Sequence, residues 1–426
     1  MVMPQPTRFR YVMLAGVFVN VVINYLDRSN ISVAATGITS ELGLSTVQLG
    51  YLFSAFGWTY TFLQIPGGIL SDRIGIRKLY TITLVMWSLA TLLQGFATGL
   101  LMLIGLRVLI GVFEAPSYPM NNRIVTSWFP DNERAGAIAT YTSGQFIGLA
   151  FLTPLLAIIQ FHLGWRGLFI VSGLIGILWG IAWYFFYRSP AEHKKVNQAE
   201  LDQIESGGGL TGTKESVNNN KTVSWTDIGL VLSKRKLWGI YIGQFGVNST
   251  MIFFLTWFPK YLMTSKKMNF LESGLMTSAP FFCAFLGVLT SGFLSDYLVK
   301  RNVSVGVARK APVITGLLLS ISILGANYVE DHAFVIAFMC LAFFGNGLAS
   351  ITWVFVSLLA PKNLVGVAGG AFNFIGGSAT IIVPIVIGYL VADGVYSGAL
   401  IFISAMTLMA SLSYIFLVGK IDRIRV

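Results

Sequence analysis

The chain has 426 residues and a formal net charge of +11, yet only 11% of its residues are charged, against roughly 25% in ordinary soluble domains. Hydrophobic residues make up 55% of the chain and aromatic residues 14%. So few charges cannot cover a water-exposed surface of this size, so the composition excludes a soluble enzyme, a nucleic-acid-binding protein and a disordered chain.

The N-terminus and the cysteines exclude further classes. The first apolar stretch follows a short polar and basic segment and is too long for a secretory signal peptide, so we predict that it is retained as a membrane helix. Both cysteines, Cys283 and Cys340, lie inside apolar runs, which excludes a disulfide framework and a cysteine metal site.

Twelve apolar runs reach the roughly 20 residues that cross a bilayer, and a polar segment separates six from six. The sequence therefore predicts an all-α membrane protein with two six-helix bundles, 1–187 and 237–426, joined by a cytoplasmic central loop, 188–236. Within this loop, 197–204 is expected to form a short surface helix, followed by a flexible linker. The predicted spans are 11–37, 47–70, 79–99, 101–127, 135–161, 165–187, 237–263, 272–299, 310–328, 333–359, 364–392 and 396–419.

Lysine and arginine are distributed unevenly between the two sides of this arrangement. With the N-terminus inside, 23 of the 29 basic residues fall on the cytoplasmic side, four fall outside and two lie within spans. Cytoplasmic loops carry such an excess, so we expect a multi-pass protein with both termini in the cytoplasm. The same distribution explains the basic net charge without nucleic acid as a partner.

An internal repeat relates the two halves. At an offset of 224 residues, the second span of the first half matches the second span of the second half at eight of 28 positions. Shared glycine and leucine can arise by chance in membrane helices, but Asp72 and Arg77 also recur, as Asp296 and Arg301. Two repeated six-helix halves, with a site between them near the midplane, are typical of secondary transporters.

Four charged residues fall well inside predicted spans: Asp27, Arg28, Arg107 and Glu114. Each would cost at least about 2.5–3.5 kcal/mol at the bilayer centre if it faced lipid, so we expect all four to face the interior and pair. Arg107 and Glu114 are seven residues apart and share one helix face. One interpretation is a structural ion pair that locks helices together. Two acids and two bases in one interior favour the other, a pathway for protons or ions.

The loop after the second span reads GGILSDRIGIRK, with two adjacent glycines at its start that allow close helix packing, one acid and three bases. A basic loop that merely sets topology is one interpretation. The pattern nevertheless resembles the signature of the major facilitator superfamily, which follows the second span and is linked to conformational gating. In the second copy Tyr297 replaces Arg73, so the resemblance is less complete there. The resemblance assigns gating to Gly68, Asp72, Arg73, Gly75, Arg77 and Lys78.

A closer resemblance extends over essentially the whole chain. The segments NYLDRSNISVA (24–34), GVFEAPSYPMNNRIVTSWFP (111–130), YTSGQFIGLAFLTPLL (141–156) and GGAFNFIGG (369–377) resemble the bacterial sugar-acid transporters of the anion:cation symporter family. This resemblance implies the major facilitator fold, with twelve transmembrane helices in two pseudo-symmetric halves. It also implies a proton-coupled symporter that imports a sugar acid across the bacterial inner membrane by alternating access. D-galactonate is the expected substrate, and another hexonate, a hexarate such as glucarate or a hexuronate is the alternative.

The resemblance further implies roles for residues in the spans. Asp27 and Glu114 correspond to the two acids that carry protons, and Arg107 to the arginine that partners them. Arg28 corresponds to the residue that meets the substrate carboxylate. The groups expected around the sugar hydroxyls are Tyr25, Tyr60, Gln145, Ser350, Thr352 and Asn373, with Trp353 beside them.

Elementary chemistry supports the same kind of site. A polyol acid needs one cation for its carboxylate and several donors and acceptors for its hydroxyls. Gln145 and Asn373 each offer both, and they sit in the fifth spans of the two halves. Each polar residue alone is also explained by an interhelical hydrogen bond, and each aromatic residue by packing. Gln244 and Asn248 in the seventh span are weaker candidates for the same cavity.

Two rival functions belong to other classes. A proton-coupled exporter of organic anions or drugs would be expected to show an aromatic, weakly polar cleft. A membrane enzyme or receptor would leave the repeat and the buried charges unexplained, so we do not expect an enzyme. The expected partners are the sugar-acid anion, protons and the lipid bilayer, with a monomeric chain. There is no phosphate-binding loop, so ATP is not expected to drive the process, and there is no metal-ligand cluster. No cofactor is expected, and protons are the coupling ion that the resemblance implies.

Overall fold

The computed structural model describes residues 5–211, 225–361, 364–391 and 394–424, and within these ranges the chain is helical without strands. The N-terminal half contains α1 (Phe9–Leu42), α2 (Thr46–Ile74), α3 (Ile76–Gln94), α4 (Leu100–Glu114), α5 (Ser117–Trp128) and α6 (Asp131–Phe186). Three short helices follow: η1 (Pro190–Glu192), α7 (Gln198–Ser206) and α8 (Trp225–Ser233). The C-terminal half contains α9 (Arg235–Thr256), α10 (Phe258–Thr264), α11 (Phe270–Lys300), α12 (Val305–Ser320), η2 (Ile321–Asn327), α13 (His332–Leu348), η3 (Ala349–Thr352), α14 (Trp353–Leu359), α15 (Val365–Gly377), α16 (Ala379–Leu390), α17 (Ser397–Leu412) and η5 (Ser413–Val418).

These elements form the twelve membrane-length rods of the predicted fold. Nine helical segments in the described chain are long and apolar enough to cross a membrane. One of them, α6, contains two rods, because Gly164 (φ 67°) turns the chain between them in a conformation that favours glycine. The other two rods, α2 and α9–α10, are long enough but more polar. The expected surface helix is present as α7, whereas most of the predicted linker lies outside the described residues.

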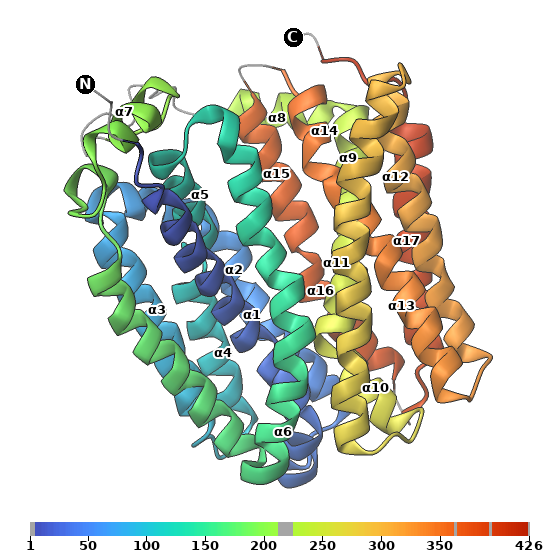
Figure 1. The fold of residues 1–426 in the computed structure, drawn as a ribbon. Helices are drawn as coiled ribbons and strands as arrows, with labels where there is room; N and C mark the ends of the chain where they lie inside the picture. The colour runs from blue at the N-terminus through green and yellow to red at the C-terminus, as the bar shows by residue number, and fades with distance from the viewer. Residues whose placement is uncertain (1–4, 212–224, 362–363, 392–393, 425–426) are drawn as a thin grey trace.

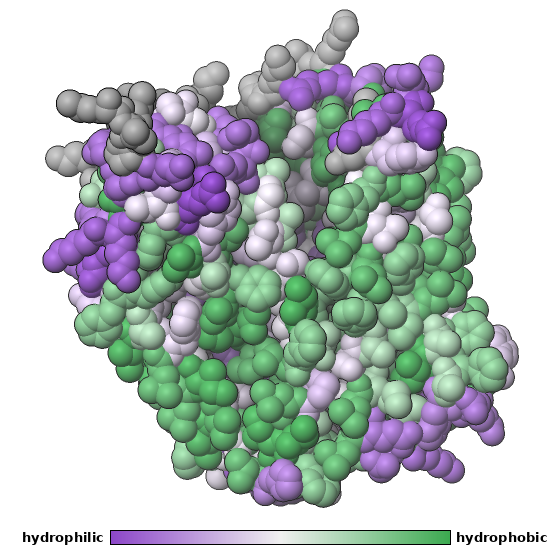
Figure 2. Space-filling view, viewed as in Figure 1, coloured by the Kyte–Doolittle hydropathy of each residue, from purple (hydrophilic) through white to green (hydrophobic). Residues whose placement is uncertain are grey.

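Both ends of the chain lie at one end of the bundle, together with α7 and α8 (Figure 1). We call this the terminal end and the opposite one the far end. On the face shown in Figure 2, hydrophobic residues cover the middle of the molecule, and hydrophilic residues gather toward the two ends. Phe151, Phe185 and Phe293 are 70%, 69% and 75% exposed on outward-facing helices. An apolar surface of this extent fits lipid as its surroundings.

The two halves pack against each other mainly at the far end. One buried apolar cluster joins side chains of α1–α6 with side chains from the far ends of the C-terminal helices. A second cluster is confined to the C-terminal half near the terminal end. Figure 2 shows the surface hollowed between the halves on that side. The molecule is therefore closed at the far end and open toward the terminal end.

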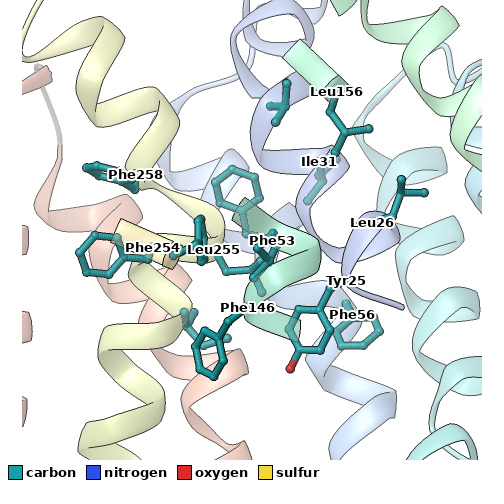
Figure 3. Packing of buried hydrophobic residues seen from close by; sticks show 14 of the residues in the cluster. Tyr25, Leu26, Ile31, Phe53, Phe56, Phe146, Leu156, Phe254, Leu255 and Phe258 are labelled. Atoms are coloured by element: carbon teal, nitrogen blue, oxygen red, sulfur yellow. The ribbon is translucent and has the colours of Figure 1, made fainter. Parts of the chain in front are cut away.

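Aromatic side chains fill the contact between the halves (Figure 3). The rings of Phe53 and Trp257 meet edge to face with centroids 5.2 Å apart, and Phe146 meets Phe343 at 6.3 Å. Phe254 stacks on Phe343 at 4.1 Å within the C-terminal half. No ion pair joins the two halves among the described residues. One buried cation does cross the contact, because Lys260 of α10 is 6% exposed and donates from Nζ to Thr39 Oγ1 of α1 at 3.1 Å.

A close backbone approach of α2 and α16 also holds the far end closed. A Cβ atom at Gly50 would lie 2.6 Å from the Pro384 carbonyl oxygen and 3.3 Å from the Gly388 Cα atom. Both neighbours are backbone atoms and cannot rotate away. We predict that Gly50→Val separates α2 from α16 and shifts the protein toward a state that is open at the far end.

Electron paramagnetic resonance distances between spin labels on far-end loops of the two halves would measure this shift. We expect longer distances for Gly50→Val than for the unsubstituted protein. Gly136→Val is the matched control, because a Cβ atom there meets nothing within 4 Å. Unchanged distances in Gly50→Val would mean that this helix contact does not hold the closed state.

Candidate functional site

An ion pair joins Arg28 of α1 to Glu114 of α4 inside the N-terminal half. Glu114 Oε1 accepts a hydrogen bond from Arg28 Nε at 2.6 Å and lies 2.5 Å from Arg28 Nη2. The Glu114 side chain is fully buried, and the Arg28 side chain is 11% exposed. A guanidinium carries five N–H donors, so this contact through one carboxylate oxygen leaves donors for a second anion.

Three aromatic rings surround the Arg28 guanidinium. Its central carbon lies 4.9 Å from the ring centroids of Tyr25 and Phe56 and 4.5 Å from that of Tyr60. Such contacts stabilise a cation by about 0.5–2 kcal/mol each. The Tyr25 hydroxyl also donates to Gln145 Oε1 at 2.8 Å. The structure thus brings together the four N-terminal candidates for substrate binding. It adds Phe56, which sequence reasoning missed because an apolar residue in a membrane span carries no signal of a binding role.

Asp27 has different neighbours from Arg28, because consecutive helical positions point about 100° apart. The Trp87 indole of α3 donates from Nε1 to Asp27 Oδ2 at 3.1 Å. Arg107 of α4 donates from Nη1 to the Asp27 backbone carbonyl oxygen, also at 3.1 Å. Among the described residues, the Asp27 carboxylate forms no ion pair. The expectation that all four buried charges pair is therefore met by Arg28 and Glu114 alone.

Hydrogen-bonded side chains connect three elements of the C-terminal half. Thr352 Oγ1 of η3 donates to Gln244 Oε1 at 2.6 Å, and Gln244 Nε2 donates to Asn248 Oδ1 at 3.1 Å. Asn248 Nδ2 then donates to the Gly376 carbonyl oxygen of α15 at 2.8 Å. The weaker sequence candidates Gln244 and Asn248 are thus linked directly to Thr352. The two residues are four positions apart in an otherwise apolar span, and this spacing is the sequence signal that could have identified them as strong candidates.

The remaining C-terminal candidates have no contact with the Arg28 site in the described structure. Asn373 is exposed and Ser350 is half-buried. Trp353 is 47% exposed, and its ring packs edge to face on Phe372 at 5.2 Å.

The loop from Gly68 to Lys78, for which the sequence predicts gating, lies at the terminal end between α2 and α3. Gly75 joins the two helices at φ 86°, a left-handed conformation that glycine adopts without steric cost. Arg77 Nε donates to the Tyr184 carbonyl oxygen at 2.8 Å, and its guanidinium lies 4.0 Å from the Tyr184 ring centroid. Arg77 therefore attaches the loop to the end of α6. Gly68 is half-buried, Arg73 and Lys78 are exposed, and the Asp72 side chain lies outside the described part of the structure.

The second copy of this loop is attached differently. Arg301 Nε donates to the Tyr297 hydroxyl at 3.1 Å, and its guanidinium lies 5.2 Å from the ring centroid. Tyr297 stands where the first copy has Arg73, so the substitution gives this arginine a partner within its own loop. The two copies thus share residues but not the same contacts.

Comparisons with known proteins identify the family. The Major Facilitator Superfamily matches residues 17–384, so the chain belongs to this superfamily. The chain is 52% identical to a D-galactonate transporter of Escherichia coli O6:H1 (strain CFT073) over 422 residues, covering 99% of this chain and 98% of that protein. It is 42% identical to a probable galactarate/D-glucarate transporter of Bacillus subtilis (strain 168) over 426 residues, covering 98% and 94%. These relatives are transporters and not enzymes, as the sequence predicts.

A solved structure shows the same fold. A bacterial homolog of the human lysosomal transporter Spinster, in an inward-facing and unoccupied conformation, superimposes with a TM-score of 0.72. The match covers 95% of this chain and 96% of that chain at 18% sequence identity. At this identity the likeness concerns the fold alone, and it agrees with the predicted major facilitator architecture.

Proposed function

We propose that this member of the Major Facilitator Superfamily imports a sugar-acid anion together with protons across the bacterial inner membrane. The observation that carries the proposal is the Arg28–Glu114 pair, a cation held by one carboxylate inside a cage of aromatic rings. D-galactonate is the first candidate substrate, because the 52%-identical relative is a D-galactonate transporter. Galactarate and D-glucarate come second, from the 42%-identical relative.

Glu114 and the substrate carboxylate compete for Arg28, and this competition couples proton binding to substrate binding. While Glu114 is ionised, it neutralises the guanidinium, and an arriving carboxylate meets no net attraction. Protonation of Glu114 removes that charge and frees N–H donors for bidentate binding of the substrate. Two unit charges about 6 Å apart interact by about 2.8 kcal/mol at an effective dielectric constant of about 20, roughly a hundredfold in affinity. Proton and substrate therefore favour each other's binding, as symport requires.

The open side of the molecule supports import by alternating access. The distribution of lysine and arginine favours a cytoplasmic terminal end. With that orientation, the hollow between the halves corresponds to a state that releases substrate inward. Opening of the far end and closure of the terminal end would then admit substrate from outside. The loop from Gly68 to Lys78 lies where the halves must close, in agreement with a gating role. A single chain contains both halves, so we propose that it acts as a monomer.

Uptake of radiolabelled sugar acids into proteoliposomes tests this function. We expect D-galactonate to accumulate only with an inward proton-motive force and to acidify the lumen as it enters. Two acids allow two protons per monoanion, so we also expect an inward positive current that draws about 2.3 kcal/mol per 100 mV from the membrane potential. Uncharged galactose should not compete, because it has no carboxylate for Arg28. Uptake that ignores the proton gradient, or proton-driven export, would contradict the proposal.

A further inference from the structure

A row of polar side chains runs along one face of α1 inside the N-terminal half. Its members are spaced four, three and three residues apart, which places them on the same side of a helix. At 1.5 Å per residue, the row extends about 15 Å along the helix axis. It consists of Asn20, Asn24, Asp27 and Asn30, all with 0% exposure.

A second row on α3 faces the first. The Trp87 indole donates to the Asp27 carboxylate at 3.1 Å, and the Thr91 hydroxyl lies beside the same carboxyl group. Nearer the terminal end, the Tyr80 hydroxyl lies beside the Asn20 amide. Both helices run from the terminal end to the far end, so these contacts place the two rows in register (Figure 1). The second row consists of Tyr80, Trp87, Thr91 and Gln94, again with 0% exposure.

Toward the far end of these two rows, buried amide groups have no partner among the described residues. Both amide atoms of Asn30 and both of Gln94 lack one, whereas Thr91 lies beside the Asp27 carboxyl group and Asn24 beside Glu114. A buried polar atom without a partner costs about 1–3 kcal/mol, and lipid around the bundle cannot supply one. In proteins, buried water molecules form hydrogen bonds with such groups, and each molecule makes roughly two to four of them.

We propose that a chain of water molecules lies between α1 and α3 and that Asp27 exchanges its proton with the far side through this chain. The inference rests on the proposed proton coupling and adds the route that the proton takes. Gln94, the last residue of α3, and Asn30 of α1 line the water chain toward the far end of the molecule.

At the terminal end of the rows, Asn20 Oδ1 accepts a hydrogen bond from Trp179 Nε1 at 2.7 Å. The Tyr80 hydroxyl there donates to Asn121 Oδ1 at 3.0 Å. The water chain therefore extends from Asp27 toward the far end.

This route is separate from that of the substrate. Arg28, the next residue after Asp27, turns toward the aromatic cage and Glu114, whereas Asp27 itself is fully buried against α3. The charged groups that face Asp27 are Arg107 and Glu114 of α4, and the α3 residues that face it are uncharged. One proton from the far side binds the Asp27 carboxylate as a neutral acid, and the same proton leaves toward the terminal end later in the cycle. Neutral Asp27 no longer repels ionised Glu114, so the two acids respond to each other.

Apolar substitutions at the far end of the rows test this route. In Gln94→Leu and Asn30→Leu, we expect proton-driven uptake of D-galactonate into proteoliposomes to fall at least about tenfold. Exchange of internal for external D-galactonate needs no net proton transfer and should stay within about twofold of the unsubstituted protein. Asn30→Ser keeps a polar group that binds water and should retain most of the proton-driven uptake.

Two further variants decide between a proton route and damage to the fold. Thr91→Val removes one hydroxyl with little change of shape and should slow proton-driven uptake without affecting exchange. Gln160→Leu removes a buried glutamine of α6 outside both rows and is the matched control, with both activities expected to persist.

Wild-type proton-driven uptake in both Gln94→Leu and Thr91→Val would overturn the water chain. An equal loss in Gln160→Leu would overturn it as well. If the leucine variants lose exchange too, their fold is damaged and the Thr91→Val result alone decides. Uptake by the unsubstituted protein that moves no protons would instead refute the proposed coupling, and lumenal pH measured with a trapped dye separates that outcome from the others.

Discussion

Arg28→Ala is expected to abolish uptake of D-galactonate while the protein remains folded and inserted. Arg28 is the cation that pairs with Glu114, and among the described residues no second basic side chain forms an ion pair with that acid. The Arg107 guanidinium lies 5.6 Å from the Phe56 ring centroid. Truncating one member of a buried charge pair costs roughly 2–5 kcal/mol, which corresponds to a loss of affinity between about thirtyfold and several thousandfold. Uptake at substrate concentrations below the wild-type KM measures the loss.

Two further variants make this test specific. Arg28→Lys keeps the positive charge but loses the planar fork, so it should transport poorly and with a raised KM. Arg188→Ala is the matched control, because Arg188 donates to the Tyr184 and Tyr187 carbonyl oxygens at the end of α6, away from the cage. Wild-type uptake by Arg28→Ala would remove this residue from the substrate site.

Glu114→Gln is expected to bind D-galactonate but to lose proton-driven accumulation. The amide carries no charge, so Arg28 is permanently available to the substrate carboxylate, as it is when Glu114 is protonated. In the unsubstituted protein, acidification protonates Glu114 and therefore strengthens substrate binding. In the variant this dependence on pH should disappear, with affinity fixed near the high value reached at acidic pH. Equilibrium binding titrations across pH, together with accumulation assays, measure both properties.

Asp27→Asn provides the comparison for the second acid. Its side chain contacts Trp87 and does not pair with Arg28, so the variant should lose active uptake while keeping a pH-dependent affinity set by Glu114. Accumulation against a gradient in either variant would mean that the acid concerned is not an essential proton carrier. An affinity in Glu114→Gln that still rises on acidification would refute the competition for Arg28.

The hydropathy of the sequence located the membrane-spanning helices, because each of them must be apolar over a fixed length. Hydropathy does not detect breaks within a helix. The fourth predicted span, 101–127, is divided between α4 and α5, where Glu114 ends one helix and Pro116 precedes the next. The tenth, 333–359, contains the short η3 that carries Ser350 and Thr352. These breaks depend on local backbone winding, which leaves average hydropathy unchanged.

The buried charges were predictable as a set, because a charge that faced lipid would be too costly. Their partners were not predictable. Arg107 and Glu114 share a face of α4, yet seven residues separate them by about 10.5 Å along the axis, beyond the reach of an ion pair. The partner of Glu114 comes from α1, because the packing of the two helices brings Arg28 within 2.5 Å.

The sequence by itself determined the membrane class, the twelve spans, the family resemblance and the residue types of the site, since each follows from composition, local periodicity or a contiguous motif. Tertiary structure alone decided which charges pair, how aromatic rings enclose Arg28, and that the polar rows of α1 and α3 face each other in register. It also decided at which end the halves meet. These features depend on the relative placement of helices far apart in the chain, and one sequence specifies that placement only through the sum of many weak contacts.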